Sequence, residues 1–450
     1  MASHHFTCTH QLVFPPLLFS SLQWLQLYLF EIDCLIKLSS SAARIISKSK
    51  GFLDPNLSES LKNQDKMSHY FPEEILIEIL IKLPVKTLIR FTLVSKSWHT
   101  LIRSSNFVSK HLINQNKKIP TFLLLRHFNE DDKKEHYTFH SNDEDSSVSK
   151  LAEINFPLKS RVSSTFLRIV GSCNGLICFC DDQFGTFPTK PIILFNPSIQ
   201  KHLFLPLPTV HPRSRDYVLG FGFDSQKSDF KVLRIVYDKT KSQSQIQSQS
   251  PSVDLSAKAE IYSLNKKNWG KIKLTELDSK PICSWRNVYY NGVVHWLAYN
   301  KKNSRNFILG FDFRDENFRE TLLPEALATA HAASFDVNVH CDDGLAIVEY
   351  NGFTRSCNVW VMKEYGVMGS WKKLYNIDLV EGMDEVIGFR NNNGEVFVKM
   401  LANDPLPYHL KRGFVVSYDP KSRLIKDLGV LGWLNSLYIH NYIDTLALLA

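Results

Sequence analysis

The sequence predicts two folded parts, a small all-α unit of three helices followed by a large, mainly-β domain. Between residues 72 and 102 apolar residues recur at the spacing of amphipathic helices. Beyond residue 120 they form short runs bounded by Gly, Pro, Asn and Asp, which is typical of strands. Aromatic residues make up 12% of the 450 residues and favour sheet. We place the all-α unit at 67–114 and the β domain at 115–450.

Composition and charge narrow the class of protein. The chain is 44% hydrophobic and 22% charged, as globular proteins are. Its net charge of +8 is spread along the chain, so we expect no nucleic-acid partner. The densest basic excess lies at 67–112. The eight cysteines include no Cys-x-x-Cys pair, which indicates free buried thiols in a reducing compartment, the cytoplasm or the nucleus.

Residues 1–66 form a leader, first apolar and then polar, that we expect to be dispensable or poorly ordered. Residues 12–30 carry no charge and are nominally long enough to span a bilayer. Pro15 and Pro16 interrupt this run, and no Lys or Arg precedes it. Three interpretations stay open: a segment outside the working protein, which would then start at Met67; a membrane anchor; or an organelle-targeting peptide. Without such an anchor we expect no membrane partner.

The first predicted helix starts near Pro72, because a proline costs nothing in the first helical turn. Glu73 and Glu74 favour the positive end of the helix dipole. An apolar stripe at helical spacing follows, formed by Ile75, Leu76, Ile79, Leu80 and Leu83. Pro84 ends the helix, since the residue before a proline avoids the helical conformation.

Two more short helices follow in the same segment. The second covers 85–91, and the third starts at Ser95, a candidate N-cap, and includes Trp98. The first helix is apolar over a wider arc than so small a unit needs. This surplus predicts a protein partner, and the alternative is packing against the β domain.

The helical segment resembles the F-box. The matching residues are Pro72, Lys82, Leu83, Pro84, Val85, Lys86, Leu88, Arg90, Phe91, Val94, Ser95, Lys96, Trp98, Leu101 and Ile102, and Phe71 stands where the family usually has Leu. The resemblance implies docking to an acidic Skp-type adaptor and, through it, to a cullin. We expect the adaptor-binding residues to be Pro72, Ile75, Leu76, Ile79, Leu80, Leu83, Pro84, Val85, Leu88 and Trp98. Some of these, Trp98 and Ile79 among them, would be core residues.

The β domain shows a faint repeat of about 50 residues. Predicted strands lie at 121–128, 175–180, 191–197, 217–224, 230–238, 292–299, 308–313, 344–350, 358–363 and 394–400. Four of the runs open with a glycine, Gly175, Gly292, Gly344 and Gly394, and a hairpin follows about 20 residues later. The hairpin turns fall at Asn196, Asn265, Asp312, Lys363 and Asp419.

A repeat of this length with about four strands is what a propeller blade needs, and five or six blades fit. We therefore expect a propeller-like domain. Residues 445–450 could pair with residues 121–125 and so close the ring of blades. The alternative is two packed antiparallel sheets. Two polar insertions interrupt the pattern: 129–150 is charged and partly a loop, and the Ser/Gln-rich tract 239–258 is expected to be disordered.

The β domain also resembles the F-box-associated domain of plant F-box proteins, including the kelch-like and self-incompatibility-locus members. Residues 171–176, 193–208, 217–235 and 291–298 carry this likeness in order. Both resemblances together cover 70–450. They imply a non-catalytic substrate-recognition subunit of an SCF-type ubiquitin ligase, whose β domain binds an unknown target protein.

Two rival functions stay open. Cys173 lies in a Gly-x-Cys-x-Gly pattern, a cysteine form of the nucleophile elbow, which would suit a hydrolase. The apolar run after Gly175 indicates a strand where that elbow needs a helix, so we assign no catalytic residue. Cys173, Cys178 and Cys180 have no His or fourth Cys near them in the sequence to complete a metal site, and we expect no metal and no cofactor. The other rival is a protein-binding module that works without ubiquitin, with attachment to a membrane through residues 12–30 as one form of it.

Overall fold

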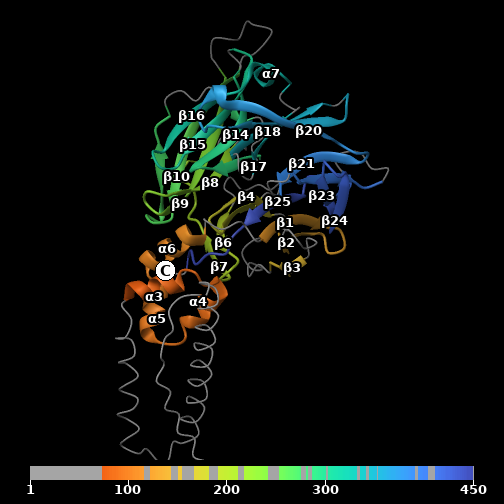
Figure 1. Ribbon diagram of the computed structural model, residues 1–450. Helices are drawn as coiled ribbons and strands as arrows, with labels where there is room; N and C mark the ends of the chain where they lie inside the picture. Colours follow the sequence, from red (N-terminus) through yellow and green to blue (C-terminus); the bar gives the residue numbers. More distant parts are fainter. Residues whose placement is uncertain are drawn as a thin grey trace, which may run out of the picture.

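The computed structural model describes residues 73–115, 122–142, 150–154, 167–181, 191–210, 217–241, 253–274, 280–281, 286–300, 303–331, 335–340, 344–351, 353–390, 394–403 and 411–448. Residues 73–115 form a helical module, which lies against one side of a large ring of β-sheets (Figure 1). The leader 1–66 and Pro72 lie outside the described residues.

The helical module contains four helices, one more than the sequence predicts. They are α3 (Glu73–Leu80), α4 (Val85–Phe91), α5 (Lys96–Arg103) and α6 (Ser105–Gln115). The predicted N-cap is confirmed, because the Ser95 hydroxyl accepts a hydrogen bond from the Trp98 amide at 3.2 Å. Ser104 caps α6 in the same way, accepting from the Phe107 amide. That repeated cap was the sequence signal for α6 that the prediction missed.

The β domain is a six-bladed propeller, and each blade has a path of four antiparallel strands. From the centre outwards, blade 1 contains β25 (Tyr438–Tyr442), β1 (Phe122–Asn129), β2 (Lys134–Ser141) and β3 (Lys150–Glu153). Blade 2 contains β4 (Leu167–Cys173), β5 (Leu176–Asp181), β6 (Ile192–Asn196) and β7 (Lys201–Phe204). Blade 3 contains β8 (Tyr217–Asp224), β9 (Asp229–Lys241), β10 (Val253–Ser263) and β11 (Asn268–Ile272).

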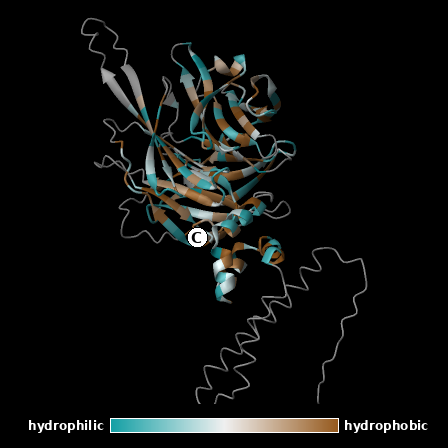
Figure 2. Cartoon of the chain, turned by 90° about the vertical axis from the view of Figure 1, so that its left-hand side faces the viewer, coloured by the Kyte–Doolittle hydropathy of each residue, from teal (hydrophilic) through white to brown (hydrophobic). Residues whose placement is uncertain are grey.

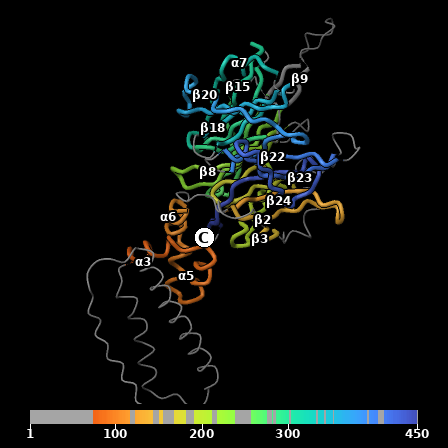
Figure 3. Tube along the Cα trace, turned by 45° about the vertical axis from the view of Figure 1, so that its right-hand side comes forward, coloured from red at the N-terminus to blue at the C-terminus, as the bar shows by residue number. Residues whose placement is uncertain are grey.

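The remaining blades repeat this order around the ring (Figures 1 and 3). Blade 4 contains β12 (Lys280–Pro281) and β13 (Val288–Tyr290), both paired with β14 (Val293–Asn300), then β15 (Arg305–Asp312) and β16 (Asn317–Leu322). Blade 5 follows the short helix α7 (Glu325–Ala328) and contains β17 (Phe335–His340), β18 (Gly344–Asn351), β19 (Ser356–Met362) and, after the 3-10 turn η3 (Met368–Ser370), β20 (Trp371–Asp378). Blade 6 contains β21 (Met383–Phe389), β22 (Val396–Leu401), β23 (Arg412–Asp419) and β24 (Leu424–Trp433).

The propeller prediction is confirmed, and the alternative of two packed sheets is wrong. The ring closes because β25 pairs with β1, for example Leu124 opposite His440. The predicted closing strand was incorrect: β25 ends at Tyr442, and residues 443–448 leave the sheet. Closure of this kind removes the exposed edges that an open sheet would leave.

The repeat glycines share one structural position. Gly175, Gly292, Gly344 and Gly394 all have positive φ angles, between 74° and 98°, at the turn between the first and second strands of their blades. This backbone conformation is strained for other residues, which explains the recurring glycine. The predicted hairpin turns likewise join the third and fourth strands of blades 2 to 6.

Both predicted insertions are shorter than expected. The segment 129–150 contains β2, a full strand of blade 1. Charged and polar residues surround its apolar residues Tyr137 and Phe139, so the sequence did not indicate a strand there. The Ser/Gln-rich tract is bounded by β9 and β10, which pair out to Lys241 and Val253. Only residues 143–149 and 242–252 of the two segments lie outside the described part of the chain.

Apolar side chains fill the spaces between neighbouring blades, and hydrophobic segments run through the strands in Figure 2. Close packing needs glycine at some contacts. A Cβ atom at Gly220 would lie 2.9 Å from the fully buried Trp296, and one at Gly222 would collide with the Phe313 ring at 2.2 Å. These positions on β8 therefore set how closely blade 3 approaches blade 4.

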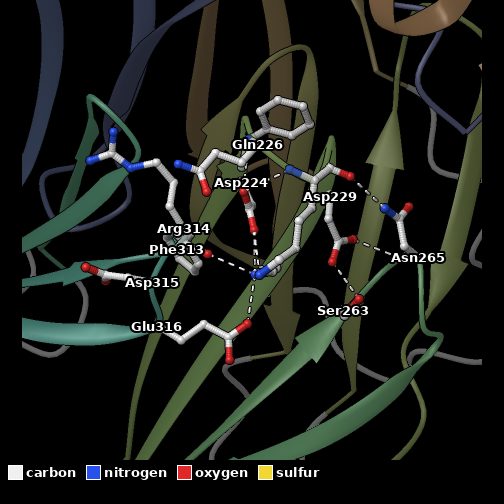
Figure 4. Close-up of polar contacts among 12 residues, drawn as sticks. Asp224, Gln226, Asp229, Ser263, Asn265, Phe313, Arg314, Asp315 and Glu316 are labelled. Atoms are coloured by element: carbon white, nitrogen blue, oxygen red, sulfur yellow. Dashed lines mark hydrogen bonds and ion pairs between the residues drawn. The ribbon is translucent and has the colours of Figure 1, made fainter. Parts of the chain in front are cut away.

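A buried lysine joins the same two blades by polar contacts (Figure 4). The Lys231 ammonium on β9 donates 2.8 Å hydrogen bonds to the Asp224 carboxylate, the Phe313 carbonyl and the Glu316 carboxylate. Asp224 belongs to blade 3, whereas the other two acceptors belong to the β15–β16 turn of blade 4. The Lys231 side chain is 2% exposed, so its charge is compensated by these contacts instead of by water.

Candidate functional site

The helical module has a compact core to which every helix contributes. Its fully or nearly buried side chains are Ile77, Leu80, Ile81, Leu83, Val85, Leu88, Phe91, Ile102 and Phe107, joined by Leu446 from the far end of the chain. Trp98 is half-buried and packs edge-to-face on Phe91, with ring centroids 5.0 Å apart. Polar contacts tie α6 to the turn after α3, as the Asn114 amide donates to the Ile81 carbonyl at 2.9 Å.

The predicted adaptor-binding residues divide between this core and the surface. Leu80, Leu83, Val85 and Leu88 are buried, so they hold the helices together and present no side chain outward. Leu76, Ile79 and Trp98 are half-buried, while Ile75 and Pro84 are exposed. The inner face of α3 is formed by Ile77, Leu80 and Ile81. The apolar arc of α3 is wider than this inner face, so the sequence pattern alone did not select which part of the arc is core.

The module has exposed apolar residues, and two of them were not among the predicted adaptor-binding residues. Leu93 and Val94, in the turn between α4 and α5, are 86% and 48% exposed. Ile75 on α3 is also exposed. Helix α6 lies on the propeller side of the module, and α3 and α5 lie on its far side in two views (Figures 1 and 3). An apolar surface that faces away from its own β domain is suited to a partner protein.

The charge of the module is asymmetric. Residues 81–115 contain six Lys or Arg and no Asp or Glu. Among them, the side chains of Lys82, Lys86, Arg90 and Lys96 are exposed. A module surface with this basic excess favours an acidic partner, because complementary charge speeds association and selects the partner.

The propeller has two faces, and the contacts of the helical module among the described residues lie on one of them. In an antiparallel blade, the turns between strands one and two and between strands three and four lie at the same end. The module contacts that end of blade 2, where Ile199 of the β6–β7 turn packs against its core. The turns between strands two and three, and the connections between blades, therefore lie on the opposite face.

One loop of the opposite face presents an aromatic side chain. Phe353, between β18 and β19, is fully exposed. The Asn351 side-chain carbonyl accepts hydrogen bonds from the amides of Phe353 and Thr354, and the Arg355 carbonyl accepts one from the Leu379 amide at 2.8 Å. The loop backbone is thus held in place while its phenyl ring is in solvent, an arrangement typical of a recognition residue.

The arrangement around Cys173 contradicts a nucleophile elbow. Cys173 ends β4 and faces Leu176 of β5 across a tight turn at Asn174 and Gly175. No helix follows to support a thiolate. Burial raises the pKa of the Cys173 thiol well above its ordinary value, which is the opposite of activation. Cys178 and Cys180 are also buried free thiols.

Within the described ranges, no three His, Cys, Asp or Glu side chains are grouped as a metal site requires. Within the same ranges, the helices are too short or too polar to cross a membrane. An apolar groove of about 550 Å³ lies between the outer strands of blades 4 and 5, lined in part by Leu322, Trp360, Met368 and Trp371. It holds no cluster of catalytic side chains.

Comparison with known proteins gives two family matches. Residues 126–406, more than half of the chain, match the F-box associated beta propeller domain. Residues 70–110 match the F-box domain. The propeller match ends before β23, whereas the ring extends to β25.

Curated relatives align with this chain over about two thirds of its length or more. Arabidopsis thaliana F-box protein At3g07870 is 27% identical over 81% of this chain and 89% of its own length. F-box/kelch-repeat protein At3g23880 of the same plant is 29% identical over 69% of this chain and 80% of its own length. Among solved structures, TolB from Acinetobacter baumannii covers 75% of this chain and 73% of its own with 11% identity and a TM-score of 0.38, too low to carry an argument.

Proposed function

Because this chain belongs to the F-box associated beta propeller domain family, we propose that it is the substrate-recognition subunit of an SCF-type ubiquitin ligase. The helical module docks a Skp-type adaptor and, through it, a cullin. The propeller binds a target protein. Ubiquitin transfer is carried out by other subunits, so this chain contributes binding and position rather than catalysis.

The observation that carries the proposal is the exposed apolar and basic surface of the module. Leu93 and Val94 are exposed apolar side chains within residues 81–115, a stretch that contains six Lys or Arg and no acidic residue, and Ile75 of α3 is a further exposed apolar side chain. Burial of such side chains against an acidic partner would gain about 25 cal/mol per Å² of apolar surface. The module is folded and packed against blade 2, yet these side chains remain exposed, so its own β domain does not cover them.

Co-purification of the full chain with a plant Skp-type adaptor tests this role. Substitution at the core residue Leu83 would be uninterpretable, because it would unfold the module. Leu93→Asp changes an exposed side chain instead, and we expect it to weaken the complex at least tenfold. Ile113→Asp is the matched control, since Ile113 is an exposed apolar residue of α6. A folded chain that binds no adaptor would reject the ligase role and favour a ubiquitin-independent binding module.

The target is proposed to bind the propeller face opposite the module, with Phe353 as a contact. Phe353→Ala should remove target proteins that co-purify from plant extract with the native chain. Leu424→Ala is the control, because Leu424 is exposed beside the β23–β24 turn at the module end of its blade. Equal recovery of targets by both variants would place the target site elsewhere, with the groove between blades 4 and 5 the next surface to test.

A further inference from the structure

The chain does not end at the strand that closes the propeller. Residues 443–448 leave β25 and pass between blade 2 and the helical module. Leu446 is fully buried in the module core beside residues such as Leu88 and Phe107. The next residue, Ala447, is buried with Leu112 of α6 in the core shared by blades 2 and 3. Successive residues of this C-terminal segment thus belong to two different cores.

Polar side chains of blade 2 hold the backbone of the C-terminal segment. The Asn196 side-chain amide is fully buried and donates to the carbonyls of Thr445 at 3.0 Å and Ala447 at 2.7 Å. Its own side-chain carbonyl accepts from the Ser198 amide at 2.9 Å. The Ser198 hydroxyl donates to the Asp444 carboxylate at 2.9 Å and accepts from the Thr445 amide at 3.3 Å.

The fit of the segment against blade 2 leaves no space. A Cβ atom at Gly175 would lie 2.4 Å from the Thr445 side chain and 2.5 Å from the Ile443 carbonyl. The Tyr442 hydroxyl donates to the Gly175 carbonyl at 3.2 Å, and Lys201 donates to the Leu448 carbonyl at 3.2 Å. Each described residue from 444 to 448 therefore has a contact with the propeller, the module or both.

We propose that residues 443–448 are a permanent strut that fixes the helical module in one orientation on blade 2. Covalent connection alone would not do this, because the chain between α6 and β1 is a single tether. The strut adds to the direct packing of Ile199 and Leu112 a connection that is both hydrogen-bonded to the propeller and inserted into the module core. If the proposed function holds, the strut keeps a fixed distance between the ligase bound through the adaptor and the target bound to the propeller. A fixed distance favours ubiquitin transfer by proximity.

The strut can be tested without an adaptor or a target. Fluorophores introduced through unnatural amino acids at Lys96 on α5 and Lys421 in the β23–β24 turn, both exposed, would report the distance between module and propeller by single-molecule energy transfer. We expect one narrow distribution for the native full chain. Asn196→Ala with Ser198→Ala removes four hydrogen bonds that blade 2 makes to the segment and leaves the module core intact, and it should at least double the width of the distribution.

Asn306→Ala is the matched control. Asn306 is a buried asparagine of blade 4 whose amide donates to the carbonyls of Leu327, Ala328 and Ala330. It therefore loses the same kind of contact at a site remote from the module, and its distribution should keep the native width. Leu446→Ala, which shortens the inserted side chain, should broaden the distribution as the double variant does.

Unchanged width in both the double variant and Leu446→Ala would overturn the strut, as would equal broadening by Asn306→Ala. This readout is separate from adaptor binding. A chain that fails to bind the adaptor but shows the expected broadening keeps the strut and loses the ligase role. A chain that binds the adaptor but shows no broadening loses only the strut.

Discussion

Replacement of Lys231 by Met should destabilise the chain by about 4 kcal/mol. The side chains of Lys231 and Asp224 are 2% and 0% exposed, and removing one partner of a buried ion pair costs about 3–5 kcal/mol. Asp224 keeps hydrogen bonds from the amides of Gln226 and Lys227, at 3.0 and 3.1 Å, so we take about 3 kcal/mol for the stranded carboxylate. The Phe313 carbonyl loses its donor, which adds about 1 kcal/mol.

Two comparison variants separate charge from packing. Lys227 lies 3.6 Å from the same carboxylate but is 58% exposed, so Lys227→Met should cost less than about 1 kcal/mol. Adding Asp224→Asn to Lys231→Met removes the stranded charge and should restore the free energy of unfolding to within about 2 kcal/mol of the native chain. Urea unfolding at equilibrium, followed by tryptophan fluorescence, gives the midpoint for all four proteins.

The dependence on pH supplies the refuting result. Burial raises the pKa of Asp224, but hydrogen bonds from Lys231 and the Lys227 amide more than offset this and hold the pKa below its usual value. In the native chain Asp224 therefore contributes stability above about pH 4 that is lost as the pH falls through its folded pKa. Without Lys231, burial should raise that pKa and the deficit should shrink on acidification. A deficit that stays constant down to pH 4 would show that packing, not charge, holds blades 3 and 4 together.

Three further predictions concern single residues. Burial lowers the pKa of His295 to about 4, so the unfolded chain takes up the His295 proton at a higher pH than the folded chain does. The free energy of unfolding should therefore fall by roughly 3 kcal/mol as the pH drops from 6.5 to 4. In His295→Gln the free energy of unfolding should fall less over the same range. Gly222→Ala should destabilise the chain by about 1–3 kcal/mol through its clash with Phe313, whereas Gly270→Ala, whose nearest neighbour is 3.9 Å away, should change the unfolding midpoint little. A thiol probe should label the buried Cys173 only at the rate of unfolding, and fast labelling of the native chain would revive the hydrolase hypothesis.

Much of the architecture was predictable because it rests on local chemistry. Pro84 and Ser95 bound helices through backbone rules that act within a few residues, and the third helix begins directly after Ser95. Gly175 and its three counterparts mark tight turns that need positive φ angles, so the spacing of these glycines in the sequence indicates the blade repeat. The second strands of blades 2 and 5 are continuous apolar runs because they are buried on both faces.

The inner strands were harder to predict for the opposite reason. β17 and β21 carry charged residues, such as Asp336 and Glu385, in the middle of what would otherwise be apolar runs. Arg286 forms ion pairs with both carboxylates, although the three residues come from three different blades. Short strands whose polar residues find their partners in other blades lack the continuous apolar run that marks the second strands.

The sequence alone was enough to predict the F-box, the propeller-like fold, its approximate repeat and the positions of its turns. Each of these is marked by residue types at fixed spacings, because each depends on contacts between near neighbours in the chain. Only the tertiary structure shows which part of the apolar arc of α3 is core, since that arc is wider than the surface that the module buries. Only the tertiary structure shows where residues 443–448 pack. Leu446 meets the module core across more than 330 residues of chain, a contact that depends on ring closure and that no local pattern encodes.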